Sequence, residues 1–510
     1  MKLLLLAAYF AVLLFIGFKC RRGANSVDGF VLGGRSVGAW LTAFAYGTSY
    51  FSAVVFVGYA GQFGWKYGIA ASWAGIGNAL VGSLLAWTVL GRRTRLLTQH
   101  LDASTMPEFF GRRFDSRALK IVASVIIFVF LVPYTASLYN GLSRLFGMAF
   151  SIDYSVCIVL MSVLTAVYVI AGGYLATAIN DFIQGIIMLF GLCAVIGAVI
   201  LSKGGLTAAL DGLARVTDPS VTATPGIFAS FFGPDPLNLL FVVILTSLGT
   251  WGLPQMVQKF YAIKNEEAVR KGTVISTLFA FVIAGGCYFL GGFGRLFGDK
   301  VDVAKDGFDA IIPAMLSGLG PGLIALTVIL VLSASMSTLS SLVITSSSTL
   351  TTDFIKESFA RDMQPKREVF TIRVFVLVFI AISAVLAMIQ HKSSVTFIAQ
   401  LMGISWGALA GSFLAPFLYA LYWKGTTKAA CWVSFLFGSG IMIWDMVARS
   451  TLPKILQSPI NCGSIAMLAG FVIVPLVSLV TKAPDRRFTD KLFACYDRQH
   501  PVASKTALAD

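Results

Sequence analysis

The sequence of 510 residues has few charged side chains, few histidines and no grouped cysteines. Only 12% of its residues are charged, against roughly 25% in a typical soluble domain. With 57% hydrophobic residues and a mean hydropathy of +0.82, a soluble protein is excluded. The seven cysteines lack zinc or disulfide spacing, and the three histidines form no pair. Because no nucleophile with a base and no metal-ligand spacing is present either, the sequence predicts a protein that is not an enzyme.

What the sequence has instead is long apolar runs. Counting runs of about 20 residues gives about thirteen transmembrane helices, so we expect an all-α polytopic membrane protein. The expected spans lie near 3–19, 38–61, 67–91, 121–147, 152–171, 176–201, 237–260, 272–294, 319–350, 369–389, 394–423, 427–447 and 461–481.

The positive charge indicates how the chain lies in the membrane. Lys19, Arg21 and Arg22 follow the first span, and a basic cluster of this kind marks a cytoplasmic end. We therefore expect a multi-pass protein of the cell membrane, with the N-terminus outside and the C-terminus in the cytoplasm. Topology and contact with the lipid bilayer account for the net charge of +15, so no nucleic acid is expected as a partner. No obligatory protein partner is evident.

One span carries an unusual run of hydroxyls from Ser333 to Ser341. A lipid-facing helix has no use for them, and oxygen-only clusters suit hard cations. Ser337 and Thr338, with a nearby backbone carbonyl, could replace part of the water shell of a sodium ion. The alternative is that these hydroxyls bond back to carbonyls one turn earlier, or pack small faces between helices.

Two spans, the second and the seventh, are predicted to be broken. Residues 42–52 place Gly47 among small polar residues, and residues 245–255 contain Gly249, Gly252 and Pro254, which weaken a helix. Irregular backbone at membrane depth survives only where it lines a cavity. Each break would open a block of five spans, which indicates an inverted repeat with solute bound between the breaks.

This pattern predicts six regions. They are an N-terminal extra helix and cytoplasmic linker (1–37), a first five-helix repeat (38–201), an outer loop (202–236), a second five-helix repeat (237–423), two C-terminal helices (424–481) and a cytoplasmic tail (482–510).

Four motifs, in order along the chain, resemble those of the sodium/solute symporter family. They are Asp28 to Gly38, Met106 to Phe110 with Arg113-Phe114, Ala171 to Leu175 with Asp181 and Gln184, and Met336 to Ser340. Within that family the resemblance is nearest to bacterial members that import proline. It implies a LeuT-type fold and co-transport of Na⁺ with a small-molecule solute.

The resemblance also implies ligands for sodium. A first site would use the backbone carbonyls of Thr48, Phe51 and Ala334 and the hydroxyls of Ser337 and Thr338. A candidate second sodium site would use the remaining family positions, which here are Asp181, Ser340 and Ser341.

The solute is expected at the two breaks, and its predicted contacts are Ser49, Tyr50, Tyr134, Ser247, Thr250, Trp251 and Pro254. Tyr50 stands where the proline carriers have an aspartate, and Thr246 and Thr250 replace aromatic residues. The expected function is therefore sodium-coupled symport of a small organic solute, with an amino acid such as proline favoured. Alternatives are an organic acid or a sugar-like solute, a proton-coupled carrier that uses Asp181, and a membrane solute sensor.

Overall fold

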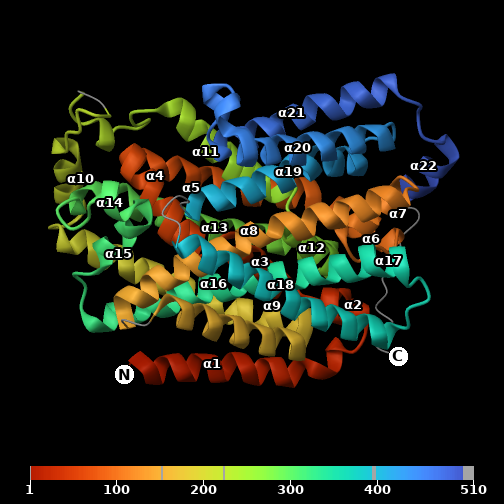
Figure 1. Cartoon of the computed structure of the whole chain (residues 1–510), viewed down its shortest axis with the longest axis horizontal. Coiled ribbons are helices and arrows are strands. Elements are labelled where there is room, and N and C mark those ends of the chain that lie inside the picture. Colours follow the sequence, from red (N-terminus) through yellow and green to blue (C-terminus); the bar gives the residue numbers. More distant parts are fainter. Residues whose placement is uncertain (1, 151–152, 222–223, 393–397, 498–510) are drawn as a thin grey trace.

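The computed structural model describes residues 2–150, 153–221, 224–392 and 398–497, and the regular elements of these residues are helices. Their long helices lie nearly parallel to one another, along the horizontal direction of Figure 1. Ten of the helical runs in the described residues are long and apolar enough to cross a membrane. Large apolar side chains such as Phe15, Phe190 and Val480 are 65%, 75% and 83% exposed, as lipid-facing residues should be. The predicted all-α, multi-pass architecture is therefore confirmed.

Two of these runs are long enough for two crossings each. Val54–His100 has 47 residues and Tyr154–Ser202 (α9) has 49, whereas one crossing needs about 20. Each contains a glycine with a positive φ, Gly68 at +64° and Gly173 at +56°. A Cβ at Gly173 would lie 3.0 Å from the carbonyl oxygen of Phe30, so both the space and the backbone angle require glycine there. The count of about thirteen spans stays a prediction.

Both predicted helix breaks are present. Helix α3 (Ala39–Tyr50) ends at Phe51, whose backbone is extended (φ −103°, ψ 93°), before the π-helix η3 (Val54–Tyr59) and α4 (Ala60–Tyr67) continue. Helix α11 (Pro236–Leu248) passes into a short 3-10 turn, η8 (Gly249–Trp251), and α12 (Pro254–Ala262) starts after an extended Leu253. Proline begins α12 because its missing N–H is not needed in the first turn of a helix.

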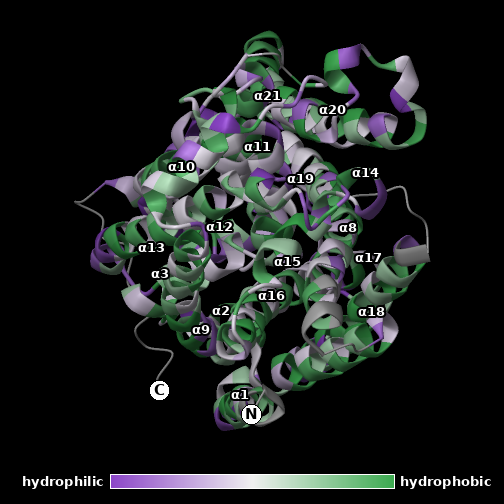
Figure 2. Cartoon of the chain, turned by 90° about the vertical axis from the view of Figure 1, so that its left-hand side faces the viewer, coloured by the Kyte–Doolittle hydropathy of each residue, from purple (hydrophilic) through white to green (hydrophobic). Residues whose placement is uncertain are grey.

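Helix α16 (Pro321–Thr349) lies inside the bundle, where it packs against α3, α8, α9 and α12. Figure 2, which looks along the helices, shows α1 (Lys2–Lys19) at one edge and α21 (Pro459–Val480) at the opposite side. The other long helices are α8 (Arg117–Phe150), α13 (Glu266–Gly292), α18 (Pro365–Lys392), α19 (Ile398–Tyr422) and α20 (Lys428–Ala448). The hydroxyl run of α16 thus lies in protein rather than in lipid.

The short elements gather at the two ends of the bundle. At one end lie α10 (Leu206–Arg215), α14 (Val303–Asp306) and α15 (Ile311–Leu316) (Figure 1). At the other end lie α6 (Arg92–His100), α7 (Met106–Arg113), α17 (Lys356–Phe359) and α22 (Arg486–Phe493). Segments predicted to be outside and segments predicted to be cytoplasmic therefore occupy opposite ends. The predicted six regions and their boundaries stay a prediction.

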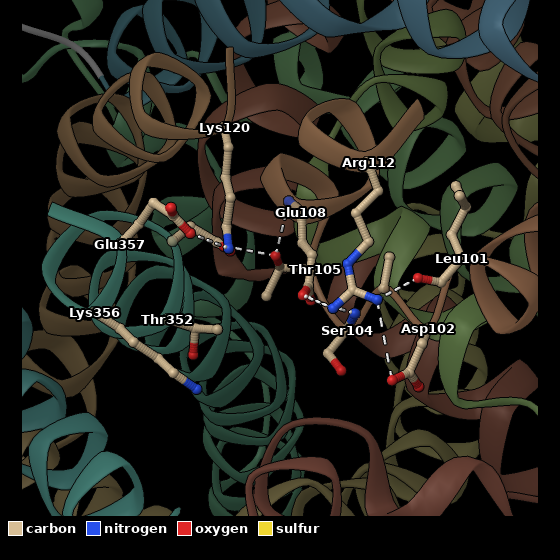
Figure 3. A network of polar contacts seen from close by, with 12 residues as sticks. Leu101, Asp102, Ser104, Thr105, Glu108, Arg112, Lys120, Thr352, Lys356 and Glu357 are labelled. Atoms are coloured by element: carbon tan, nitrogen blue, oxygen red, sulfur yellow. Dashed lines mark hydrogen bonds and ion pairs between the residues drawn. The ribbon is translucent and has the colours of Figure 1, made fainter. Parts of the chain in front are cut away.

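A group of polar contacts ties the second of these ends together (Figure 3). Asp353, in the π-helical continuation of α16 (Leu350–Ile355), is fully buried and accepts a hydrogen bond of 2.5 Å from Thr105. The ammonium of Lys120 lies 3.5 Å from Asp353 and 3.2 Å from Glu357. Thr105 is the N-cap of α7 and Lys120 lies in the first turns of α8, so Asp353 holds α16 to both helices.

Replacing Asp353 by alanine is expected to lower the thermal stability of the purified protein. The change removes a buried carboxylate and leaves the Lys120 ammonium with Glu357 alone, and breaking a buried pair costs about 3–5 kcal/mol when no partner is left. Because Glu357 remains, we expect a smaller loss of about 2 kcal/mol, visible as a lower melting temperature in detergent.

The matched control is Glu267→Ala, which breaks the exposed pair of Glu267 with Lys271 (2.8 Å, side chains 62% and 66% exposed). Exposed pairs are screened by water and contribute little to stability, so this variant should melt close to the unmodified protein. Equal melting temperatures for the two variants would show that Asp353 does not hold these helices together.

Candidate functional site

The hydroxyls of α16 fall into two groups by what they bond to. Those of Ser335 and Ser348 donate back along their own helix, to the carbonyls of Val331 (2.8 Å) and Ile344 (2.7 Å). Ser337 and Thr338 reach across to α3, where they approach the carbonyl oxygen of Thr48 at 3.1 and 3.0 Å. Ser337 and Thr338 also approach carbonyls one turn earlier in α16, so bonding back along the helix is shown for the run, while the sodium interpretation stays a prediction for these two residues.

The broken end of α3 explains why the carbonyl of Thr48 is available to partners outside its own helix. Within a helix this oxygen would accept from the N–H four residues later, at Ser52. The extended backbone at Phe51 takes Ser52 out of the helix, so the last carbonyls of α3 lack their usual partners. The hydroxyls of Ser337 and Thr338 fill that role for Thr48.

Four of the five predicted sodium ligands meet at this point. The hydroxyls of Ser337 and Thr338 also lie 3.2 and 3.0 Å from the carbonyl oxygen of Ala334, one turn earlier in α16. Both side chains are fully buried. The fifth, the carbonyl of Phe51, belongs to the residue that follows the end of α3, and no contact described for it reaches α16. Such a set of neutral oxygens suits one monovalent cation, because a cation needs only dipoles to replace part of its water shell.

A chain of polar groups continues from this cluster. The hydroxyls of Ser49 and Ser341 are 2.7 Å apart, and the ammonium of Lys259 donates to Ser341 at 2.9 Å. Lys259 lies on α12, is 2% exposed, and its nitrogen stands 5.0 Å from the centre of the Tyr174 ring. Both broken helices therefore meet α16 at Ser341.

Of the three candidate second sodium ligands, Ser341 contacts Lys259 directly and Asp181 interacts with it through space. Asp181 on α9 is fully buried, and neither of its carboxylate oxygens accepts a hydrogen bond from the described residues. It interacts electrostatically with Lys259. Ser341 accepts from Lys259, whereas the hydroxyl of Ser340 donates to the carbonyl of Ser337 at 2.9 Å.

The predicted solute residues of the second break turn toward the segment 78–82. Ser247 donates to the Asn78 side chain (3.2 Å), Thr250 to the carbonyl of Gly82 (3.1 Å), and the Trp251 indole to the carbonyl of Val81 (3.0 Å). These three side chains therefore already have partners within the protein. Pro254 starts α12 directly after the break.

Tyr50 and Tyr134 meet at another residue, Trp406 of α19. The Trp406 ring lies 6.0 Å from each tyrosine ring, and perpendicular to that of Tyr134 (87°). A Cβ at Gly249 would lie 2.8 Å from this ring, so Trp406 also touches the second break. The Tyr50 hydroxyl donates to the carbonyl of Thr246 at 2.5 Å. The Tyr134 hydroxyl and the Trp406 N–H are buried and make no hydrogen bond of ordinary geometry with the described residues, although the Tyr134 hydroxyl interacts with the side chains of Ser52 and Trp406.

Sequence reasoning missed Trp406, Lys259 and Gln255. Gln255 is 1% exposed, and its amide makes no hydrogen bond with the described residues. Neither Lys259 nor Trp406 was among the predicted site residues. Two sequence features could have indicated them. Lys259 lies only five residues past Pro254, and Trp406 is flanked by Ser405 and Gly407 in an otherwise apolar span.

Comparisons with known proteins agree with this geometry. A sequence profile described as the sodium:solute symporter family matches residues 30–438. The sodium/proline symporter of Staphylococcus aureus is 29% identical over 493 residues, which are 94% of this chain and 93% of the relative. The expected similarity to sodium/proline symporters is thereby confirmed.

Solved structures show the same fold. A Na⁺-coupled sialic acid symporter, in a substrate-bound outward-open state, superposes with a TM-score of 0.72 at 15% identity and covers 95% of this chain and 99% of its own. The manganese transporter of Eremococcus coleocola gives a TM-score of 0.50 at 14% identity, with 88% and 95% covered. The fold is LeuT-type, as predicted, and the chain belongs to the sodium:solute symporter family, whose members carry a solute together with Na⁺.

Proposed function

We propose that this symporter imports a small amino acid, with proline first among the candidates, and that one sodium ion binds where α3 meets α16. The observation that carries the proposal is the pair of hydroxyls, Ser337 and Thr338, which meet the freed carbonyl of Thr48. The ligands would be those two hydroxyls and the carbonyls of Thr48, Ala334 and Phe51.

Sodium at this point would couple its own gradient to the solute. The ion would bind both the broken helix α3 and α16, and so stabilise the arrangement in which the two are close. A membrane potential of 100 mV adds about 2.3 kcal/mol for each charge that moves inward. The solute would then be carried against its gradient by the energy released as sodium enters.

The solute would bind beside the ion, between the two helix breaks. Broken helices expose N–H and C=O groups, which suit the carboxylate and ammonium of an amino acid. The buried Tyr134 hydroxyl and Trp406 N–H interact with each other but make no hydrogen bond of ordinary geometry with the described residues, so a solute could bond to them, and the rings of Tyr50 and Trp406 offer apolar surface. Among the predicted contacts, we infer that Tyr50 and Tyr134 face the solute with Trp406. Ser49, Ser247, Thr250, Trp251 and Pro254 would shape the walls of the site.

The similarity to sodium/proline symporters supports proline as the first solute to test. The residues Thr246 and Thr250, which stand in place of aromatic ones, would make the site more polar than that of a proline carrier. An organic acid or a sugar-like solute is therefore the second candidate.

We further infer that the protein works in the cell membrane without altering its solute chemically. The N-terminus would lie outside and the C-terminus in the cytoplasm, because the basic residues gather at the end that contains α6, α7 and α22. The contacts of Asp353 with Thr105 and Lys120 would then hold the cytoplasmic end closed, and would part when the site opens inward.

Thr338→Ala is expected to raise the sodium concentration for half-maximal proline uptake into proteoliposomes by about tenfold. The change removes one ligand, and a hydrogen bond or contact to a charged group is worth about 1.5–3 kcal/mol. Uptake at saturating sodium should be reduced less than uptake at low sodium.

Ser335→Ala is the matched control for this test. Ser335 is equally buried on the same helix, but its hydroxyl bonds only back to Val331. The sodium concentration for half-maximal uptake should be the same in Ser335→Ala as in the unmodified protein. The proposed ion site would be wrong if this concentration were also unchanged in Thr338→Ala.

Trp406→Phe is expected to raise the KM for the solute by about tenfold, because one N–H donor to the solute is lost while a smaller aromatic ring remains. Uptake of radiolabelled proline gives the KM directly. If proline is not taken up, competitors that raise the melting temperature in sodium identify the solute to use.

Trp87→Phe serves as the control, since Trp87 is also fully buried and its N–H is also unpaired. Trp87 packs against Tyr46 and Phe260, and Tyr46 stands between it and the predicted solute contact Tyr50. An unchanged KM in Trp406→Phe would remove Trp406 from the solute site.

A further inference from the structure

Lys259 is a buried cation at the place where the family resemblance suggests a second sodium ion. Its side chain is 2% exposed and belongs to α12, the second half of a broken helix. Its ammonium donates to Ser341 and lies 5.0 Å from the Tyr174 ring centre. A lysine in such surroundings needs a negative charge nearby, because an isolated charge is costly inside a membrane protein.

Asp181 supplies that charge. It is fully buried and within electrostatic reach of Lys259, although no hydrogen bond or direct ion pair joins the two described side chains. The pair is neutral as a whole. A second sodium ion between them would leave one positive charge in excess, in a region where charge is costly unless it is compensated.

The hydroxyls suggested for a second sodium are also engaged. The oxygen of Ser341 accepts from Lys259 and lies 2.7 Å from that of Ser49, and the hydroxyl of Ser340 donates to the carbonyl of Ser337. An ion would have to displace the lysine from Ser341, and so would compete with a cation that is covalently held in the site.

We propose that Lys259 takes the place of a second sodium ion, so that this symporter binds one sodium per cycle. The ammonium compensates Asp181 and holds α12 to α16 through Ser341, as a bound ion would, but it is never released. The proposal rests on the sodium site proposed above, which supplies the one exchangeable ion.

Replacing a second sodium ion by Lys259 limits the solute gradient that the carrier can build. With one sodium, a tenfold gradient and 100 mV, a neutral solute can be concentrated by roughly several hundredfold. A carrier coupled to two sodium ions under the same conditions would reach roughly the square of that ratio.

The number of ions can be measured without knowing the solute. Equilibrium binding of ²²Na⁺ to the purified protein should show one site per chain with a Hill coefficient of one. Lys259→Gln removes the cation, leaves Asp181 uncompensated, and should bind two sodium ions. The double variant Lys259→Gln with Asp181→Asn should return to one.

Lys259→Arg keeps the positive charge and is the matched control, with one site expected. Two sites in the unmodified protein, or one in Lys259→Gln, would overturn the proposal. If Lys259→Gln does not fold, the unmodified protein and Lys259→Arg still test the proposal, because two sodium sites in either would contradict a lysine in the place of sodium.

Thr338→Ala tests the first sodium site separately. Unchanged ²²Na⁺ binding in that variant would count against the first site and not against Lys259.

Discussion

The rest of the structure depends on how the carbonyls at the end of α3 are paired. In the interior of a membrane protein an unpaired carbonyl costs several kcal/mol. Thr48 avoids this cost because the hydroxyls of Ser337 and Thr338 donate to it from α16. A hydroxyl can turn its hydrogen elsewhere and keep its oxygen in place. Ser337 also has the carbonyl of Ser333 within 2.9 Å. A cation can therefore take over the Thr48 oxygen while Ser337 keeps an acceptor for its hydrogen.

The same region joins the ion to the solute. Ser49 follows Thr48 in α3 and reaches Ser341, while Lys259 brings α12 to the same hydroxyl. Tyr50, the next residue, packs toward Trp406 and donates to the backbone of the second broken helix at Thr246. Successive residues of one helix end thus face the proposed ion and the proposed solute. If the ion and the solute bind as proposed, a change at either position would shift the other, which would be the physical basis of coupling.

Much of this could be predicted from the sequence, because its causes are local. Gly249, Gly252 and Pro254 weaken a helix wherever they occur, and a run of hydroxyls in an apolar span must face protein. The fold class, both breaks and a backbone carbonyl beside Ser337 and Thr338 followed from such patterns. Partners that lie far apart in the chain could not be predicted from local patterns, and the family resemblance alone named Thr48 as that carbonyl. Nothing near Asp181 in the sequence indicates Lys259, and Trp406 joins Tyr50 and Tyr134 only because α19 packs beside both breaks. The pairing of Ser247, Thr250 and Trp251 with residues 78–82 likewise depends on helix packing.

Charge compensation explains why a lysine is compatible with sodium coupling. With Asp181 and Lys259 forming a neutral pair, the carrier without its ion has no excess charge at this point. A zwitterionic amino acid adds none. If one sodium binds as proposed, it would be the one charge that arrives and leaves, so the membrane potential would act on the loaded carrier and on a single ion. A second mobile sodium would increase the driving force, but the site would need a carboxylate free of Lys259. A fixed cation would instead keep α12 and α16 joined through the cycle, and only the contact between α3 and α16 would depend on bound sodium.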